Sequence, residues 1–138
     1  MKRTWTIALL LALSVVLPFA AFAQANKIGI FVPGVVAGSP LYEQMVAGAE
    51  RAVKEFPNAS LKVVEAGFNQ GEWTEKMTSL AATGEYDVIV TSNPAMPFIT
   101  RDVAKAFPKQ KFLHLDAYFP GNPQIYSLLY NQVEQAYF

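Results

Sequence analysis

Short apolar, strand-like runs alternate with helix-like segments along most of the chain, and this alternation limits the possible folds more than any other feature. Five runs have the length, the β-branched content and the flanking turn residues of buried strands, and they span residues 27–32, 61–65, 86–90, 111–115 and 125–129. Alternating strands and helices with short links predict a parallel sheet with right-handed crossovers. We therefore expect an α/β fold with three αβα layers and strand order 2-1-3-4-5.

Three of the segments between the strands begin with recognisable helix-start signals. Ser39 precedes Pro40, the arrangement of an N-cap followed by a proline in the first turn. Asn69 and Glu72 have the spacing of a capping box, and Asn93 is again followed by a proline. These patterns predict helices that begin directly after Ser39, Asn69 and Asn93.

Residues 1–23 have the three parts of a secretory signal peptide. Two basic residues open the chain, residues 7–16 are almost wholly apolar, and Ala-Phe-Ala at 21–23 places small residues where a signal peptidase reads them. We expect cleavage before Gln24. The alternative is a membrane anchor, but the apolar run is shorter than the roughly 18 residues that a membrane span needs.

Charge and cysteine content exclude several classes of function. The chain has 11 basic and 11 acidic residues, and cleavage would remove two of the basic ones, which leaves a net charge of −2. No basic run or stripe occurs, so nucleic acid and anionic lipid are not expected partners. The chain has no cysteine, so no thiol is present to carry a lipid. We expect a soluble periplasmic or secreted protein that is not a lipoprotein.

Chemical motifs of enzymes and metal sites are missing from the sequence. The glycine-containing stretch 34–39 lacks the lysine of a phosphate-binding loop, and no nucleophile elbow or dinucleotide fingerprint is present. No His, Asp and Glu cluster has metal-ligand spacing. We therefore expect no catalytic residues, no metal and no cofactor.

The expected strand order places three loops where ligands bind. The chain reverses direction between the first and third strands, and such sheets bind ligands outside the carboxyl ends of the strands at that point. The loops there are 33–40, 91–98 and 116–122. Helix starts offer unpaired backbone N–H groups, so Ser39 and Asn93 are candidate ligand contacts as well as caps. The loops 33–40 and 91–98 carry no lysine or arginine, which disfavours a strongly anionic ligand.

Three further side chains deserve a functional and a structural interpretation. Asp116 follows the fourth strand, where it can accept paired hydrogen bonds from sugar hydroxyls or cap the next turn. Tyr42 lies one turn into the first helix, where its ring can stack on a flat ligand or fill the core. His114 is the single histidine, and its place inside a strand predicts a hydrogen-bonded core residue.

Four segments of the sequence carry a family resemblance, namely residues 27–34 (KIGIFVPG), 86–94 (YDVIVTSNP), 107–116 (FPKQKFLHLD) and 130–137 (YNQVEQAY). In this order they resemble the N-terminal part of the basic-membrane-protein family of ABC-transporter substrate-binding proteins. The resemblance implies the type I periplasmic-binding-protein fold, in which this chain forms most of the first of two lobes.

The resemblance also implies site residues and partners. The aspartate after the family's fourth strand matches Asp116, and the turn after its third strand matches 91–93, which adds Ser92 to the candidates. The family's first loop commonly has an acidic residue followed by Ser-Phe-Asn; residues 37–42 here read Ala-Gly-Ser-Pro-Leu-Tyr, so the acid is absent and Tyr42 stands for the aromatic residue. The implied function is an exported receptor that hands a small polar ligand, nucleoside- or sugar-like, to an ABC permease in the inner membrane.

Two other classes of function stay open. One is a periplasmic sensor subunit that presents its liganded form to a kinase or a chemoreceptor, and the other is an α/β enzyme. Residues 131–138 have a helical pattern that stops without a capping glycine or a basic last turn. We therefore expect residues 24–138 to be an incomplete N-terminal lobe, with the second lobe further along the full-length chain.

Overall fold

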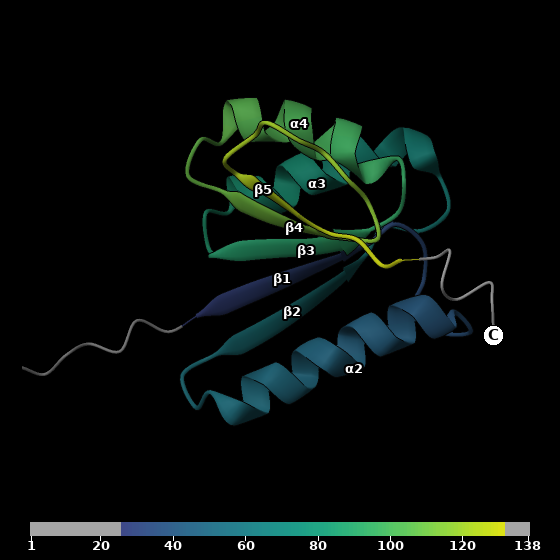
Figure 1. Cartoon of the computed structure of the whole chain (residues 1–138), viewed down its shortest axis with the longest axis vertical. Coiled ribbons are helices and arrows are strands. Elements are labelled where there is room, and N and C mark those ends of the chain that lie inside the picture. Colours follow the sequence, from purple (N-terminus) through teal and green to yellow (C-terminus); the bar gives the residue numbers. More distant parts are fainter. Residues whose placement is uncertain (1–25, 132–138) are drawn as a thin grey trace, which may run out of the picture.

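A parallel sheet of five strands forms the centre of the computed structural model, which describes residues 26–131 (Figure 1). The predicted signal peptide and the helical pattern of 132–138 lie outside the described residues. The strand order is β2-β1-β3-β4-β5 and every neighbouring pair is parallel, which confirms the predicted topology. The strands are β1 (Lys27–Val32), β2 (Ser60–Glu65), β3 (Val88–Ser92), β4 (Lys111–Leu115) and β5 (Ile125–Leu128).

The helices cover the sheet on both faces, as the three-layer prediction requires (Figure 1). Helix α2 (Pro40–Glu55) packs on one face, and α3 (Trp73–Ala82) and α4 (Met96–Ala106) pack on the other. The chain steps from β1 to β2 in one direction and from β2 through β3 to β4 in the opposite direction. Because each crossover is right-handed, the reversal places α2 opposite α3 and α4. None of the described helices is both long and apolar enough to cross a membrane.

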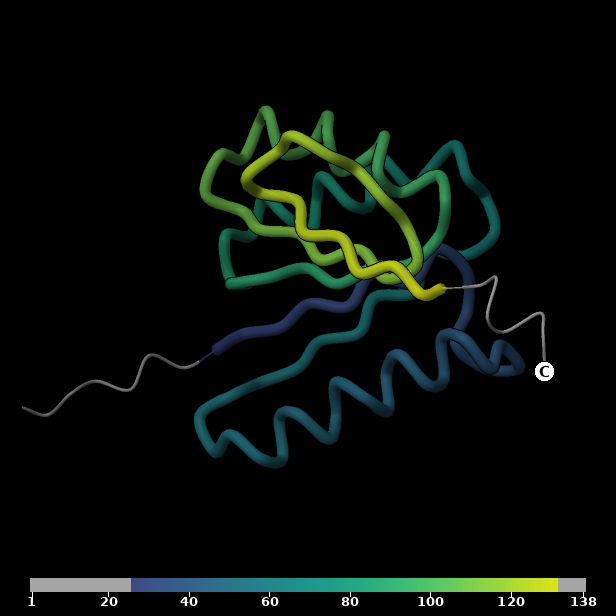
Figure 2. The backbone as a smooth tube through the Cα atoms, viewed as in Figure 1, coloured from purple at the N-terminus to yellow at the C-terminus, as the bar shows by residue number. Residues whose placement is uncertain are grey.

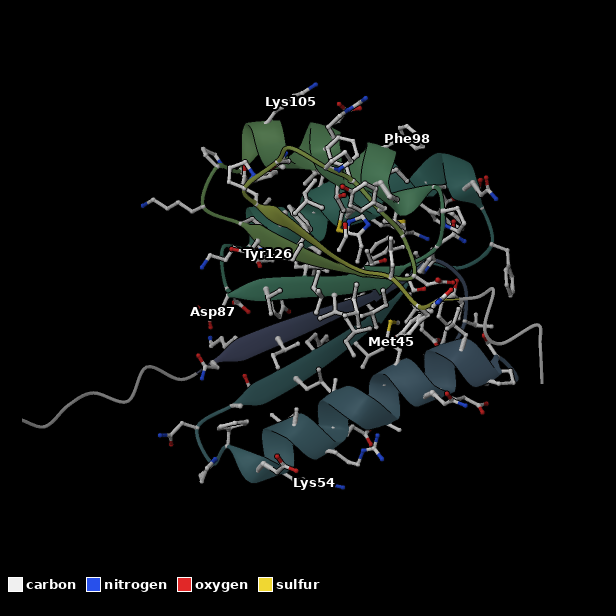
Figure 3. The ribbon with its side chains drawn as sticks, in the orientation of Figure 1. Met45, Lys54, Asp87, Phe98, Lys105 and Tyr126 are labelled. Carbon is white, nitrogen blue, oxygen red and sulfur yellow. The ribbon has the colours of Figure 1, made fainter. Side chains whose placement is uncertain are left out.

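Each face of the sheet has its own hydrophobic core. Successive strand residues point to opposite faces, so Phe31 enters the core under α3 and α4 while Ile30 enters the core under α2. Met45 points from α2 toward the sheet (Figure 3) and is almost fully buried there. Burial on both faces explains why the central strands are continuous apolar runs rather than alternating ones.

The connection from β4 to β5 crosses without a helix and runs along the α4 side of the sheet (Figure 2). Gln124 anchors it there, because its side-chain amide donates to the carbonyl oxygens of Ala104, Phe107 and Gln110 at 3.2, 2.9 and 3.0 Å. These carbonyls lie at the end of α4 and just beyond it, where a helix leaves its acceptors unpaired. Gln124 thus acts as a C-terminal cap supplied from the neighbouring connection.

The prediction that a helix begins directly after Asn93 is wrong. Strand β3 continues to Ser92, and α4 begins only at Met96, with Ala95 as its N-cap. Asn93 instead closes a turn: its side-chain oxygen accepts from the Ala95 amide at 2.9 Å, and its carbonyl accepts from the Met96 amide at 3.0 Å. Its φ of 144° is incompatible with a helix, so the asparagine caps a turn that comes before the helix.

The other two helix starts are correctly placed. Asn69 caps its start as predicted, because its side-chain oxygen accepts from the Gly71 amide at 3.2 Å, whereas the Ser39 cap differs from the prediction. Ser39 occupies the N-cap position of α2, yet its side chain makes no capping bond. The amide of Gly38 donates to Glu43 Oε1 at 2.9 Å instead. Asn69 begins a short 3₁₀ turn, η1 (Gln70–Glu72), ahead of α3, and its side-chain amide donates to Glu72 at 2.7 Å. The glutamate therefore reaches the cap's side chain rather than its backbone.

Candidate ligand-binding site

All five strands end at one edge of the sheet, called the carboxyl edge below. The register places Val32 beside Glu65 and places Ser92 beside Leu115, which pairs in turn with Leu128. The loops that follow the strands therefore leave the sheet at the same level. Asp87, labelled in Figure 3, precedes β3 and marks the opposite edge. The sequence-predicted candidates Ser39, Tyr42, Ser92, Asn93 and Asp116 all belong to the carboxyl edge or to the helix start above it.

Asn93 and Asp116 are brought together at the centre of this edge. Each follows the last residue of its strand, and those last residues, Ser92 and Leu115, are register partners. Neighbouring strands lie about 4.8 Å apart, so the two following residues are adjacent. Both are half-buried. The Asp116 amide donates to the Leu128 carbonyl at 2.8 Å, which ties this corner to β5 as well.

Both residues have an unusual backbone conformation. Asn93 has a φ of 144° and Asp116 a φ of 58°, and within residues 26–131 they are the two non-glycine residues with positive φ. Such conformations cost free energy and are concentrated at ligand-binding and catalytic sites. Two of them side by side distinguish this corner from the other connections at the carboxyl edge.

Ser92 lies beneath this corner rather than on its surface. It is the last residue of β3 and only 1% exposed. The preceding Thr91 is likewise fully buried. A ligand would reach Ser92 only at the floor of the edge, so its contact with a ligand stays a prediction.

Ser39 and Tyr42 lie on the β1 side of the reversal point. The first loop is fixed to β2, because the Val36 amide donates to Glu65 Oε1 at 2.7 Å. The Tyr42 hydroxyl donates to the Pro33 carbonyl at 3.3 Å, so its ring lies back against the loop. Tyr42 is half-buried, which leaves part of the ring exposed at the edge.

Sequence reasoning missed two residues that the structure places at the carboxyl edge. Glu65 ends β2 and binds the first loop, as described above. Phe68, in the connection after β2, is 76% exposed and has its ring beside Gly34. Its position directly before the predicted cap Asn69 is common for an apolar residue that packs on the helix. Because that position normally predicts packing, the local pattern does not indicate that Phe68 is exposed.

The charges at this edge are mainly acidic. Glu43 and Glu65 accept hydrogen bonds from the amides of the first loop, and Asp116 lies across the reversal point. Lys76 is held beneath the β2 connection, where its ammonium group lies 2.7 Å from Glu72 and donates to the Ala66 carbonyl at 2.8 Å. This electrostatic environment suits a neutral polar ligand better than an anionic one.

His114 supports the edge from inside the core, as predicted. It is fully buried, and its Nε2 lies 2.8 Å from the hydroxyl of Thr100, which itself donates to the Met96 carbonyl at 2.9 Å. Burial lowers the pKa of His114 to about 4, so the ring is neutral at pH 7. Its Nδ1 and the neighbouring Thr91 hydroxyl have no hydrogen-bond partner among the described residues.

Two surface depressions among residues 26–131 lie away from the sequence-predicted candidates. One lies along β2 beside α3 and the other along β2 beside the end of α2, and none of the candidates lines either of them. No group of three side chains able to hold a metal ion occurs in residues 26–131. The strand ends and loops of the carboxyl edge, called the wall below, carry the sequence-predicted candidates.

Residues 25–138 match the family model of PnrA-like ABC transporter substrate-binding proteins. The chain belongs to this family. The match covers every strand and every described helix, and it confirms the resemblance inferred from the four sequence segments. Members of the family are substrate-binding proteins, and the carboxyl-edge wall is where such a sheet presents a ligand.

Solved structures share the fold of this substrate-binding family member at low identity. A solute-binding protein of an ABC transporter system from Aeropyrum pernix K1 has a TM-score of 0.68 and 20% identity over 75% of this chain and 28% of its own. One from Conexibacter woesei DSM 14684 has a TM-score of 0.58 and 19% identity over 75% of this chain and 34% of its own.

The fold alone does not identify a transport protein. A transcriptional activator of the comK gene from Bacillus halodurans reaches a TM-score of 0.59 at 14% identity, over 74% of this chain and 34% of its own. These likenesses show the fold and no more. The chain spans about a third or less of each of these structures.

Proposed function

We propose that the protein is an exported solute-binding receptor of an ABC importer and that residues 24–138 form most of its N-terminal lobe. The ligand is a small polar molecule, nucleoside- or sugar-like, held between this lobe and a second lobe of the full-length chain. The observation that carries the proposal is the adjacent pair Asn93 and Asp116, two strained residues at the carboxyl edge of a chain in a substrate-binding family.

The chemistry of the wall supports binding rather than catalysis. Asp116 supplies a carboxylate that can accept hydrogen bonds from two neighbouring hydroxyl groups of a sugar ring. The turn at Asn93 and the first loop near Ser39 present backbone groups and hydroxyls for further polar contacts. The acidic surroundings explain why a neutral ligand is preferred.

Ligand release follows from the two-lobed arrangement. One wall makes only part of the contacts, so closure of the second lobe completes the site and opening of the lobes at an inner-membrane permease lowers the affinity. The protein must be exported to meet the permease, and the predicted signal peptide provides for that export. The lack of cysteine supports a mature protein without a lipid anchor.

The proposal is tested with the full-length product of the gene that encodes this chain. The protein is purified from the periplasm or medium, its N-terminus is sequenced, and it is titrated calorimetrically with adenosine, inosine, guanosine, uridine, cytidine and D-ribose. We expect an N-terminus at Gln24 and micromolar binding of at least one compound. Binding of none of them contradicts the proposed ligand class, and an N-terminus at Met1 in exported protein contradicts the processing.

A further inference from the structure

Phe68 presents an aromatic ring to solvent at the carboxyl edge. It is 76% exposed, the largest exposed fraction among the exposed large hydrophobic residues of the described chain. Leaving an apolar ring in water forfeits the free energy that its burial would contribute. A single exposed apolar side chain needs no explanation on an ordinary surface, but this one lies where the family's fold presents its ligand.

Packing on the neighbouring helix does not account for this ring. Phe68 precedes the cap residue Asn69, the position from which an apolar side chain can pack on the residue four positions into the helix. That residue is Trp73, which is only 3% exposed and is buried in the core below. A ring that packed on Trp73 would be covered, whereas Phe68 is not.

The connection that carries Phe68 is held rigidly on both sides. The amides of Ala66 and Gly67 donate to the carbonyls of Val32 and Gly34 at 2.8 and 2.9 Å. The Trp73 indole N–H donates to the Gly67 carbonyl at 2.8 Å. A side chain presented from a fixed backbone loses less conformational entropy when it binds a ligand.

The ring also belongs to an aromatic corner shared with the first loop. A Cβ added to Gly34 would lie 3.2 Å from Tyr42 Cε2 and 3.5 Å from Phe68 Cε1. Both rings therefore approach the same face of Gly34, and the glycine makes room for them. The hydroxyl of Tyr42 is fixed by the Pro33 carbonyl, so its ring is held in place as well.

We propose that Phe68 contacts the ligand directly and selects compounds that carry a flat unsaturated ring. The inference rests on the proposed function and deepens it. An exposed phenyl face stacks on any planar heterocyclic ring, whereas a bare sugar gains less from it. The polar corner at Asn93 and Asp116 then receives the hydroxyl-bearing part of the same molecule. The competing explanation is that a surface of the second lobe covers Phe68, so that the ring does not touch the ligand.

The test compares ligands with and without a flat ring in the full-length protein. Phe68→Ala, Phe68→Leu and Phe68→Trp are titrated calorimetrically with the nucleoside that the wild type binds and with D-ribose. Alanine and leucine should weaken nucleoside binding about 10- to 100-fold, and tryptophan should stay within about threefold. Ribose binding should change less than about twofold in all three.

The control is Phe56→Ala, which removes an exposed ring at the C-terminal end of α2, at the opposite edge of the sheet, and should leave every affinity unchanged. Because Phe68 is exposed, its truncation opens no core cavity, and the melting temperature of each variant reports whether the fold is intact.

Several results would overturn the role of Phe68. Unchanged nucleoside affinity in Phe68→Ala excludes a ligand contact, and an equal loss for nucleoside and ribose indicates a lobe contact instead. A wild type that binds ribose as tightly as any nucleoside also contradicts ring selection, while the proposed receptor function stands. A wild type that binds no member of the panel contradicts the proposed function, and the inference fails with it.

Discussion

Asp116 and Asn93 combine a strained backbone with a half-buried position just after the ends of neighbouring strands. An αL conformation is disfavoured for most residues, and Asn and Asp tolerate it better than alanine does. Asp116 has the φ of that region, 58°. The residue type therefore suits the turn as well as the proposed ligand contact, and a substitution has to separate the two effects.

Replacement of Asp116 tests its contact with the ligand. In the full-length protein, Asp116→Ala should weaken binding by about 1.5–3 kcal/mol, the range for hydrogen bonds to a charged group. Asp116→Asn keeps a residue that tolerates positive φ and removes the charge, so it should lose affinity with little change in melting temperature. Unchanged affinity together with a lower melting temperature would show that Asp116 only shapes the turn.

His114 makes the stability of the core depend on pH. Its folded-state pKa of about 4 is below the ordinary value of 6.5, so the folded chain binds fewer protons than the unfolded chain. The stabilisation is complete above about pH 6.5 and is lost as the pH falls toward 4, by about 3 kcal/mol in total. His114 is the only histidine in the sequence, so no other imidazole contributes in this pH range.

The measurement is hydrogen exchange of the β3 and β4 amides at pH 7 and pH 5 in wild type and His114→Gln. After correction for the intrinsic exchange rate, the wild type should lose about 2 kcal/mol of protection more than the variant. The exposed Asp102, whose pKa is lowered to about 2 by Arg101 and Lys105, titrates below this range in both proteins. Equal losses would contradict the assignment to His114.

At the scale of elements, the connections between the strands also stabilise the fold. Gln124 is one side chain that joins the β4–β5 connection to the end of α4. Carbonyls at a helix C-terminus carry partial negative charge, and a side-chain amide satisfies them. The same position would repel a carboxylate.

Two substitutions of Gln124, one neutral and one negatively charged, should lower the free energy of unfolding by different amounts. Gln124→Leu loses the hydrogen bonds and should lower the free energy of unfolding by about 1–2 kcal/mol. Gln124→Glu adds a negative charge at the negative end of α4 and should cost more. Gln44→Glu, exposed on α2, is the control for the charge change alone. Thermal unfolding ranks the three, and equal melting temperatures for Gln124→Glu and wild type would contradict the capping role.

The elements themselves were predictable from local sequence because apolar runs and turn residues alternate so regularly. The expected strand order is confirmed, and β1 and β4 have the predicted bounds. The start of α4 was not predictable, since an asparagine followed by a proline marks a capped turn as readily as a helix. Phe68 was missed because exposure depends on the path of the β2 connection across Gly34, which no local pattern encodes.

At the scale of the whole molecule, the described chain has an apolar surface around β5. Tyr126, Leu128, Leu129 and Tyr130 are each about half exposed, and Figure 3 shows Tyr126 on β5. Contiguous apolar surface and an open strand edge favour association. Residues 24–138 expressed alone should therefore be marginally stable and self-associate, which sedimentation velocity at several concentrations measures. A monomer at every concentration would contradict this expectation.

In the proposed function, the carboxyl edge is one wall of a ligand site shared with a second lobe. The most direct measurement is a calorimetric titration of the full-length protein and of residues 24–138 with the same nucleosides and D-ribose. Because one wall makes only part of the contacts, we expect micromolar binding by the full-length protein and roughly millimolar binding, about a thousandfold weaker, by residues 24–138. Equal micromolar affinity for both would show that this chain is a complete binding unit and would contradict the account.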